Sequence, residues 1–327
     1  MGKVNLKLIL LVLLGLFIFF FSLTYFRTNN FNFAPEHKKR LINPLLKFAK
    51  FKEIQPFKYK IMELIEKDKA AGLVEETAVY FRSLSDGLWF GIDEKKEFSP
   101  ASILKIPVML TYFKMAEDNP DILNEKIKYE PQDTGFVPGV KENSTAEIGK
   151  YYSIDELIRF LIVESDNNAD ALLLRNLPPG ALNNTFRDFG IDVNNIPPEG
   201  DFVSLKICAG FLRVLYNASY INEALSEKAL EYLAKSAYRD GIVAGLPKDI
   251  AVAHKFGERF SSQTGKKELH EIAIVYYPKN PYILAIMTKG NDYNSLSKVI
   301  RDISELTYKE IDAQYKVYKR KFFILDE

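Results

Sequence analysis

Strand-like segments stand on both sides of one long helical stretch in this chain, and that order restricts the folds open to it. The runs Thr77–Leu84 and Leu88–Ile92 are rich in β-branched and aromatic residues, and the Ser-Asp-Gly sequence between them is typical of a hairpin. A mostly helical stretch follows at about 102–236, and an amphipathic helix begins near Ser295. Further strand-like runs lie at Ile250–Phe256, Leu269–Tyr277 and Tyr282–Thr288. The order predicts an α+β fold, in which a helical insertion divides one sheet, rather than an alternating parallel fold.

The composition indicates a globular protein that is not a dedicated nucleic-acid binder. Hydrophobic residues make up 47% of the chain, and 44 basic residues against 43 acidic ones leave a net charge of +1. Nucleic-acid binders usually carry a basic excess. The single cysteine, Cys208, excludes an intramolecular disulfide and a multi-cysteine zinc site, and we predict that it is a core residue. We expect no metal and no cofactor.

An uncharged and almost wholly apolar segment, Leu8–Phe26, lies near the N-terminus. As a helix it would reach about 28 Å, close to the thickness of the hydrocarbon core of a bilayer. We therefore predict an uncleaved membrane anchor within residues 1–27, a basic linker at 28–55 and a globular domain at 56–327. A cleaved signal peptide and a buried core helix are the alternatives. The apolar run is long for a signal peptide, and no small-x-small cleavage site follows it.

Ser102 and Lys105 form a Ser-x-x-Lys pattern at the start of the helical stretch. Residues three apart lie on the same side of a helix. A lysine kept neutral by burial or by nearby positive charge can accept the proton of a serine hydroxyl. The pattern alone is weak, because Ser295 and Lys298 repeat it in what we predict to be an ordinary amphipathic helix.

Two further short motifs lie downstream. A Ser-Asp-Asn sequence at 165–167 falls at a predicted helix–helix junction, where short polar side chains can point into a cleft. A Lys-Phe-Gly sequence at 255–257 lies on a predicted strand, where the lysine suits anion binding and the glycine allows another backbone to approach. Taken singly, the first also fits a turn or helix cap, and the second fits an exposed lysine near a strand end.

In this order the three motifs match the signature of penicillin-recognising serine enzymes. From about Lys58 to Tyr315 the chain resembles class A β-lactamase-type serine hydrolases, a branch of the penicillin-binding protein superfamily. The flanking sequence agrees, with Phe-Ser-Pro-Ala at 98–101 and Asp-Gly-Ile at 240–242. The resemblance implies a β-lactamase/transpeptidase-like fold. Its antiparallel sheet of five strands, flanked by the terminal helices, packs on an all-helical lobe at about 102–236, with the active site between them.

The resemblance also implies roles for individual residues. Ser102 is expected to be the nucleophile that forms an acyl-enzyme, and Lys105 its proton acceptor or relay. Ser165 passes the proton toward the leaving nitrogen, and Lys255 supplies positive potential there. The backbone N–H groups of Ser102 and Glu258 form the oxyanion hole. The expected substrate-binding residues are Asn167, Phe256, Gly257 and Glu258.

Two departures from the family pattern affect turnover and recognition. The stretch 191–202 is short, reads IDVNNIPPEGDF and lacks the Glu-x-x-x-Asn pattern that carries the deacylating glutamate of class A β-lactamases. Glu199 is its only glutamate, and no spacing argument places it over an acyl group. The second departure is Phe256, which stands where relatives usually have threonine or serine. Its missing hydroxyl removes one donor for a substrate carboxylate.

The leading hypothesis is a membrane-anchored serine hydrolase that faces the cell envelope. Its expected substrates are small-molecule β-lactams or peptidoglycan-type peptides. A penicillin-binding protein-like D,D-peptidase with slow deacylation is the first alternative. A non-catalytic envelope-binding module that keeps the fold is the second. A binder has no need for the combination of Ser102, Lys105, Ser165 and Lys255, which argues against the second alternative. The sequence leaves the oligomeric state open.

Overall fold

A computed structural model describes residues 54–130, 146–192, 194, 200–278 and 280–323. The chain divides into two units, 1–48 and 49–327, and every described residue belongs to the second. The predicted anchor, Leu8–Phe26, therefore lies outside the described residues, as does nearly all of the predicted linker. Within the described ranges, no helix combines the length and the apolar character needed to cross a membrane.

The five-stranded antiparallel sheet that the resemblance implies is present, with the strand order β2-β1-β9-β8-β7. The predicted strands are confirmed with shifts of a few residues at their ends. In the central pairing, Tyr80 lies opposite Ala285, and Ile272 lies opposite both Ala285 and Lys255. Strand β7 is last in the order, so one of its edges has no partner among the described strands. The bounds are β1 Glu76–Ser83, β2 Trp89–Ile92, β7 Val252–Phe260, β8 Lys267–Val275 and β9 Tyr282–Gly290.

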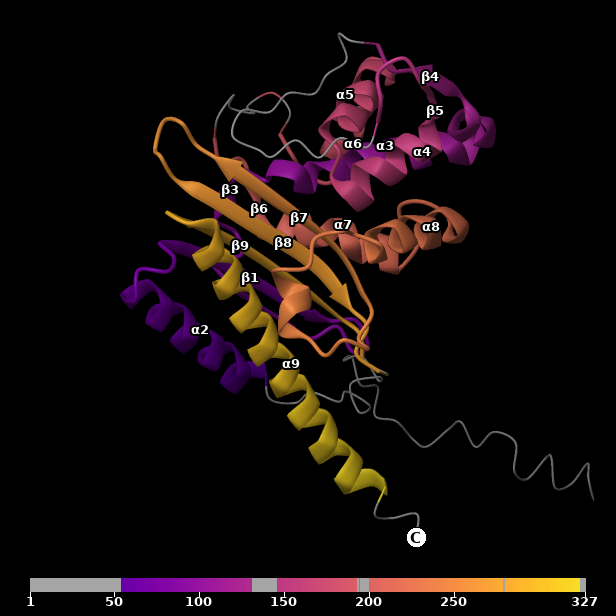
Figure 1. Cartoon of the computed structure of the whole chain (residues 1–327). Helices are drawn as coiled ribbons and strands as arrows, with labels where there is room; N and C mark the ends of the chain where they lie inside the picture. The colour runs from indigo at the N-terminus through magenta and orange to yellow at the C-terminus, as the bar shows by residue number, and fades with distance from the viewer. Residues whose placement is uncertain (1–53, 131–145, 193, 195–199, 279, 324–327) are drawn as a thin grey trace, which may run out of the picture. The chain divides into compact units, whose positions relative to one another are not determined.

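Alternating side chains of the sheet enter two separate hydrophobic cores. Ala78 and Tyr80 join the core on the side of the helical lobe, whereas Val79 and Phe81 join the core under the terminal helices. Figure 1 shows α2 and α9 together on one face of the sheet and α7 on the other. The bounds of these helices are α2 Ile54–Ala70, α7 Leu205–Tyr216 and α9 Tyr293–Phe323. The prediction that Cys208 is a core residue is confirmed, since it is fully buried in α7.

The lobe between β2 and β7 is mostly helical, as predicted, but it is not purely helical. Lys126–Lys128 (β4) pairs with Tyr151–Ser153 (β5), and Glu97–Phe98 (β3) pairs with Val203–Ser204 (β6). Strands of two or three residues are too short to show an alternating pattern, which explains why the sequence did not predict them. The helices are α3 Lys105–Asp118, α4 Ile154–Arg159, α5 Asn167–Asn176, α6 Ala181–Asp188 and α8 Glu223–Ala234.

A capping box at Ser153 and Glu156 begins α4. The Ser153 side chain accepts the backbone N–H of Glu156, and the Glu156 carboxylate accepts the backbone N–H of Ser153. We expect Ser153→Ala to lower the free energy of unfolding by about 1 kcal/mol, because it removes this cap. Urea unfolding measures the change. Ser204→Ala is the matched control, since Ser204 occupies the N-cap of α7 without a side-chain hydrogen bond. Equal losses in the two variants would contradict the prediction.

Candidate active site

Ser102 and Lys105 are brought to one side of a tight turn. Ala101–Leu104 forms a 3₁₀ helix, and the Lys105 backbone N–H donates to the Ser102 carbonyl. In 3₁₀ geometry, side chains three residues apart eclipse each other, so the hydroxyl and the amine project in the same direction. Helix α3 begins at Lys105, and Pro107 falls within its first turn, where a missing N–H is tolerated. Ser102 is half-buried, and its side chain makes no hydrogen bond to another described residue.

The Lys105 amine is buried and reaches across to the Ser-Asp-Asn motif. Its Nζ donates to the Ser165 carbonyl at 2.7 Å and to Asn167 Oδ1 at 2.6 Å, and it lies 3.4 Å from Ser165 Oγ. The side chain therefore links α3 to the start of α5. The same contacts hold the Asn167 side chain within the site, where the sequence placed it as a substrate-binding residue.

Ser165 points into the site because of the backbone around it. The π-helical turn Phe160–Glu164 ends α4, and Ser165 follows it with a φ of 56°, in the left-handed region that non-glycine residues rarely adopt. Asp166 then caps α5, since its Oδ1 accepts the backbone N–H groups of Asn168 and Ala169. The aspartate of the motif thus fixes the loop, whereas Ser165 and Asn167 face the Lys105 amine.

Lys255 approaches the same serine from the sheet. It is fully buried on β7, and its Nζ donates to Ser165 Oγ at 2.9 Å and to the Phe256 carbonyl at 2.9 Å. The Phe256 ring stacks on Tyr238, and the Lys255 amine lies 4.4 Å from the centroid of the Phe256 ring. The ring that replaces the family's hydroxyl therefore stabilises the Lys255 cation, but it offers no hydrogen bond to a substrate.

Gly257 lets β7 lie against the backbone of Ser102. A Cβ at this position would come within 2.9 Å of the Pro100 carbonyl oxygen and within 3.1 Å of the Ser102 nitrogen. Ala101, next to Ser102, has a φ of 48°, again in the left-handed region. Glu258 follows on the strand and is partly buried, and burial raises the pKa of its carboxyl group. The expected oxyanion donors, the N–H groups of Ser102 and Glu258, thus belong to two segments in direct contact.

Besides Glu258, the site contains two amines and one carboxylate whose pKa values are shifted. Burial lowers the pKa of Lys105 to about 8, and the Asp170 and Asp166 carboxylates oppose that fall. Burial and the charge of Lys105 hold the pKa of Lys255 well below its ordinary value. Burial raises the pKa of Asp170, although both lysines oppose the rise. Shifted titrations of this kind are typical of sites that move protons.

Asp170 has a place in this site that the sequence analysis did not give it. It lies on the first turns of α5, three residues after Asn167, and its Oδ1 is buried without a hydrogen-bond partner in the described part of the chain. Side chains on a helix lean toward its N-terminus, which directs this carboxylate toward the lysines. The one available signal was an acidic residue next to the short leucine run of the helix that directly follows the Ser-Asp-Asn motif.

The remaining chemical groups that the sequence singled out lie away from this site or outside the described residues. Glu199 is among the residues that the structure does not describe. Ser295 and Lys298 bond to the carboxylates of Asp292 and Asp302 at the exposed start of α9, so the second Ser-x-x-Lys pattern is not a site. His254, which belongs to none of the motifs, has its Nδ1 2.7 Å from Glu271 Oε1 within the buried sheet. Within the described ranges, no cluster of three or more histidine, cysteine or acidic side chains suits a metal ion.

This geometry can move a proton among two amines and two hydroxyl groups. Two buried amines approach one hydroxyl, that of Ser165, and a second hydroxyl, that of Ser102, lies one 3₁₀ turn from Lys105. An amine with a pKa of about 8 is partly unprotonated near neutral pH, so it can accept a proton as well as donate one. The arrangement suits a serine nucleophile with a separate proton path to a leaving group.

Comparisons with known proteins agree with this geometry. A model of the β-lactamase enzyme family matches residues 56–311. A structure of the acyl-enzyme complex of a PBP-A mutant with penicillin G is 21% identical, with a TM-score of 0.66 over 77% of this chain and 96% of that one. A variant of the last common ancestor of Gram-negative class A β-lactamases is 23% identical, with a TM-score of 0.65 over 77% and 98%.

A β-lactamase from Xanthomonas campestris is 19% identical, with a TM-score of 0.65 over 76% of this chain and 96% of that one. No curated protein matches the sequence. At these identities, the structural likenesses establish the β-lactamase/transpeptidase-like fold.

Proposed function

The chain belongs to the β-lactamase enzyme family and is a serine hydrolase, and from that premise we propose that it forms an acyl-enzyme at Ser102. The observation that carries the proposal is the approach of two buried lysines to one serine hydroxyl. Lys255 Nζ lies 2.9 Å and Lys105 Nζ 3.4 Å from Ser165 Oγ. A merely structural junction has no need for two buried amines, since each unpaired buried charge is costly.

In the proposed reaction, Ser102 attacks the carbonyl carbon of a strained or activated amide. Ser102 Oγ bonds to the carbonyl carbon, and its proton passes to the unprotonated Lys105 amine. The carbonyl oxygen becomes an oxyanion, which the N–H groups of Ser102 and Glu258 stabilise. When the carbon–nitrogen bond breaks and the carbonyl re-forms, the leaving nitrogen takes the Ser165 hydroxyl proton, and Lys105 returns to Ser165 Oγ the proton that it took from Ser102. An ester at Ser102 and a free amine result.

The proposed substrates are β-lactams or wall peptides of the D,D-peptidase type. Strand β7 lies beside Ser102 and is last in the order of the described strands, and a sheet edge of this kind can pair with an extended substrate, which supports the proposal. The PBP-A mutant formed its acyl-enzyme complex with penicillin G. The absence of a hydroxyl at Phe256 argues for weak recognition of the penicillin carboxylate.

Incubating the full-length chain with a fluorescent penicillin and following its intact mass tests the proposal. We expect one adduct, which peptide mapping assigns to Ser102. An adduct that clears indicates a β-lactamase, and one that persists indicates a penicillin-binding protein-like peptidase with slow deacylation. The absence of any adduct with penicillins and wall peptides would contradict the proposal and favour the envelope-binding module.

We expect acylation to rise with pH through about 8, because the unprotonated form of Lys105 accepts the proton and its pKa is about 8. Asp170→Asn removes a carboxylate that raises this pKa, so the rise should occur at lower pH and acylation near pH 6 should be severalfold faster. Rate constants measured between about pH 5 and pH 10 check the shift. Asp121→Asn, at an exposed acid, is the control. A profile that stays in place in Asp170→Asn would refute the electrostatic role.

We also propose that the domain lies outside the cytoplasm, held by the predicted anchor Leu8–Phe26. The reason is chemical, since β-lactams and wall peptides occur on that side of the membrane. Protease added to whole cells should then release the domain. Protection of the domain until the cells are lysed would place it in the cytoplasm and contradict the proposed location.

A further inference from the structure

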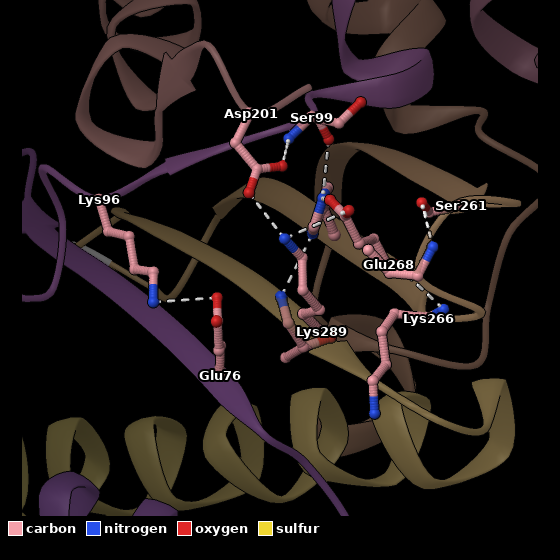
Figure 2. Close-up of polar contacts among 11 residues, drawn as sticks. Glu76, Lys96, Ser99, Asp201, Ser261, Lys266, Glu268 and Lys289 are labelled. Carbon is pink, nitrogen blue, oxygen red and sulfur yellow. Dashed lines mark hydrogen bonds and ion pairs between the residues drawn. The ribbon is translucent and has the colours of Figure 1, made fainter. Parts of the chain in front are cut away.

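The backbone of Ser99, three residues before the proposed nucleophile, is bonded on both sides by polar side chains. Its N–H donates to Asp201 Oδ1 at 2.9 Å (Figure 2), and its carbonyl accepts from the buried His270 Nε2 at 3.0 Å. Neither contact involves the reacting groups. We call Asp201, Glu268, His270 and Lys289 the Ser99 clamp.

Lys289 joins the acidic members of the Ser99 clamp. Its Nζ lies 2.7 Å from Asp201 Oδ2 and 3.5 Å from Glu268 Oε1 (Figure 2). Burial lowers the pKa of Lys289, but the hydrogen bond to Asp201 and the charges of Glu268 and Asp201 outweigh it, so the pKa is raised. Lys289 therefore stays charged and fixes Asp201, which comes from the end of the 191–202 stretch, to strand β9.

His270 has its proton position set by the sheet. It is fully buried on β8, and its Nδ1 accepts the Thr288 backbone N–H at 3.2 Å. The ring proton therefore lies on Nε2, which faces the Ser99 carbonyl at 3.0 Å and Glu268 Oε2 at 3.3 Å. Because the backbone of β9 selects this tautomer, His270 is a fixed donor to Ser99.

The segment that the Ser99 clamp holds is strained where it meets Ser102. Ala101 has a φ of 48°, and such conformations persist only where the surroundings impose them. Gly257 confines the same segment from the other side, since a Cβ there would meet Pro100 and Ser102 backbone atoms. Ser99 is the last residue before this strained turn, so fixing its N–H and carbonyl fixes the direction from which the turn begins.

We propose that the Ser99 clamp positions the nucleophile: by fixing Ser99 it holds the 99–102 backbone in the strained form that presents Ser102 for acylation. The inference rests on the proposed function. The four side chains are positioning residues, because they act through the backbone of Ser99 and not on the substrate. Their contribution should therefore be seen in the acylation rate constant and not in the affinity for the substrate.

The test measures acylation of the full-length chain by a fluorescent penicillin, with the rate constant and the dissociation constant determined separately. We expect Asp201→Ala to reduce the rate constant about 10- to 100-fold, because small misplacements of a nucleophile cost this much, and to leave the dissociation constant within about threefold. Asp201→Asn should lie between, since its amide oxygen still accepts the Ser99 N–H while the ion pair with Lys289 is lost. Lys96→Met is the matched control, because it removes the neighbouring Lys96–Glu76 ion pair, which does not touch Ser99 (Figure 2).

Two further measurements separate positioning from general stability. Adding Ala101→Gly to Asp201→Ala should recover part of the rate, because glycine adopts a positive φ without strain. Hydrogen exchange at the Ser102 and Ile103 amides should be faster in Asp201→Ala. It is measured without urea, where the urea unfolding curve of the variant shows that the protein is folded. The inference is overturned if the acylation rate constant of Asp201→Ala is within twofold of wild type. It is also overturned if the rate constant falls only in proportion to the folded fraction and Ala101→Gly does not restore it. If the wild-type chain forms no adduct, the proposed function fails, and exchange at Ser102 alone then decides the inference.

Discussion

Replacing Lys105 with methionine is expected to slow acylation of Ser102 by about 10³-fold, within the range that general bases contribute. Methionine keeps the length and the apolar stem of the side chain but removes the amine. The variant loses the proton acceptor beside Ser102. It also loses the donor to the Ser165 carbonyl and to Asn167 Oδ1, which position the second serine and the amide. Rapid-quench measurement of adduct formation at saturating fluorescent penicillin gives the rate constant.

Lys114→Met is the matched control for this variant. Lys114 lies on the same helix α3, is exposed and pairs with Glu117, so we expect its replacement to leave acylation unchanged. Because Lys105→Met also leaves two buried acceptors without their donor, its unfolding should be measured in urea alongside the rate. Acylation within tenfold of wild type in a folded Lys105→Met protein would show that another group takes the proton.

The sequence predicted the elements of the sheet well because their residues act locally. Runs such as Thr77–Leu84 are rich in β-branched and aromatic residues, and both faces of the sheet are covered, so apolar residues continue along much of β1 and β9. The short pairs β3–β6 and β4–β5 were missed because strands of two or three residues carry too little pattern to be recognised locally. The capping box at Ser153 was predictable because both partners lie within four residues and have a characteristic spacing.

The candidate site was predictable only through the order of its motifs. No local pattern reveals that Lys105 and Lys255 both meet Ser165, and the resemblance supplied that expectation. The Ser99 clamp could not be found in this way. Polar side chains at Glu268 and His270 lie on the same face of β8, and such a pattern predicts a face of the sheet that is exposed to solvent. The fold nevertheless buries both side chains near Ser99. Asp170 was missed because a lone carboxylate on a helix usually faces water.

The second large effect is expected at Gly257, where alanine should slow acylation by about 10²-fold or more. An added Cβ would lie 2.9 Å from the Pro100 carbonyl oxygen, 3.1 Å from the Ser102 nitrogen and 3.2 Å from the Ala101 Cβ. Two of these three atoms belong to the backbone, so the contact is relieved only if β7 or the 3₁₀ turn moves. Either movement separates the two proposed oxyanion donors, and losing one such donor typically costs 10²–10³-fold.

Gly210→Ala provides the control for Gly257→Ala, because a Cβ at Gly210 in α7 meets no atom within 4 Å. Alanine in that helix should leave acylation unchanged and slightly increase the free energy of unfolding. In Gly257→Ala the loss should fall on the rate constant of acylation, with the adduct still mapped to Ser102. Rates within threefold of wild type would mean that β7 and the turn separate without cost, and the Ser102 N–H would then not be a fixed oxyanion donor. If acylation is lost in Gly257→Ala and partly restored when Ala101→Gly is added, the cause of the loss is the strained backbone at Ala101. The Ser99 clamp and Gly257 confine that turn from opposite sides, so this result would show that the strained turn determines how Ser102 is presented.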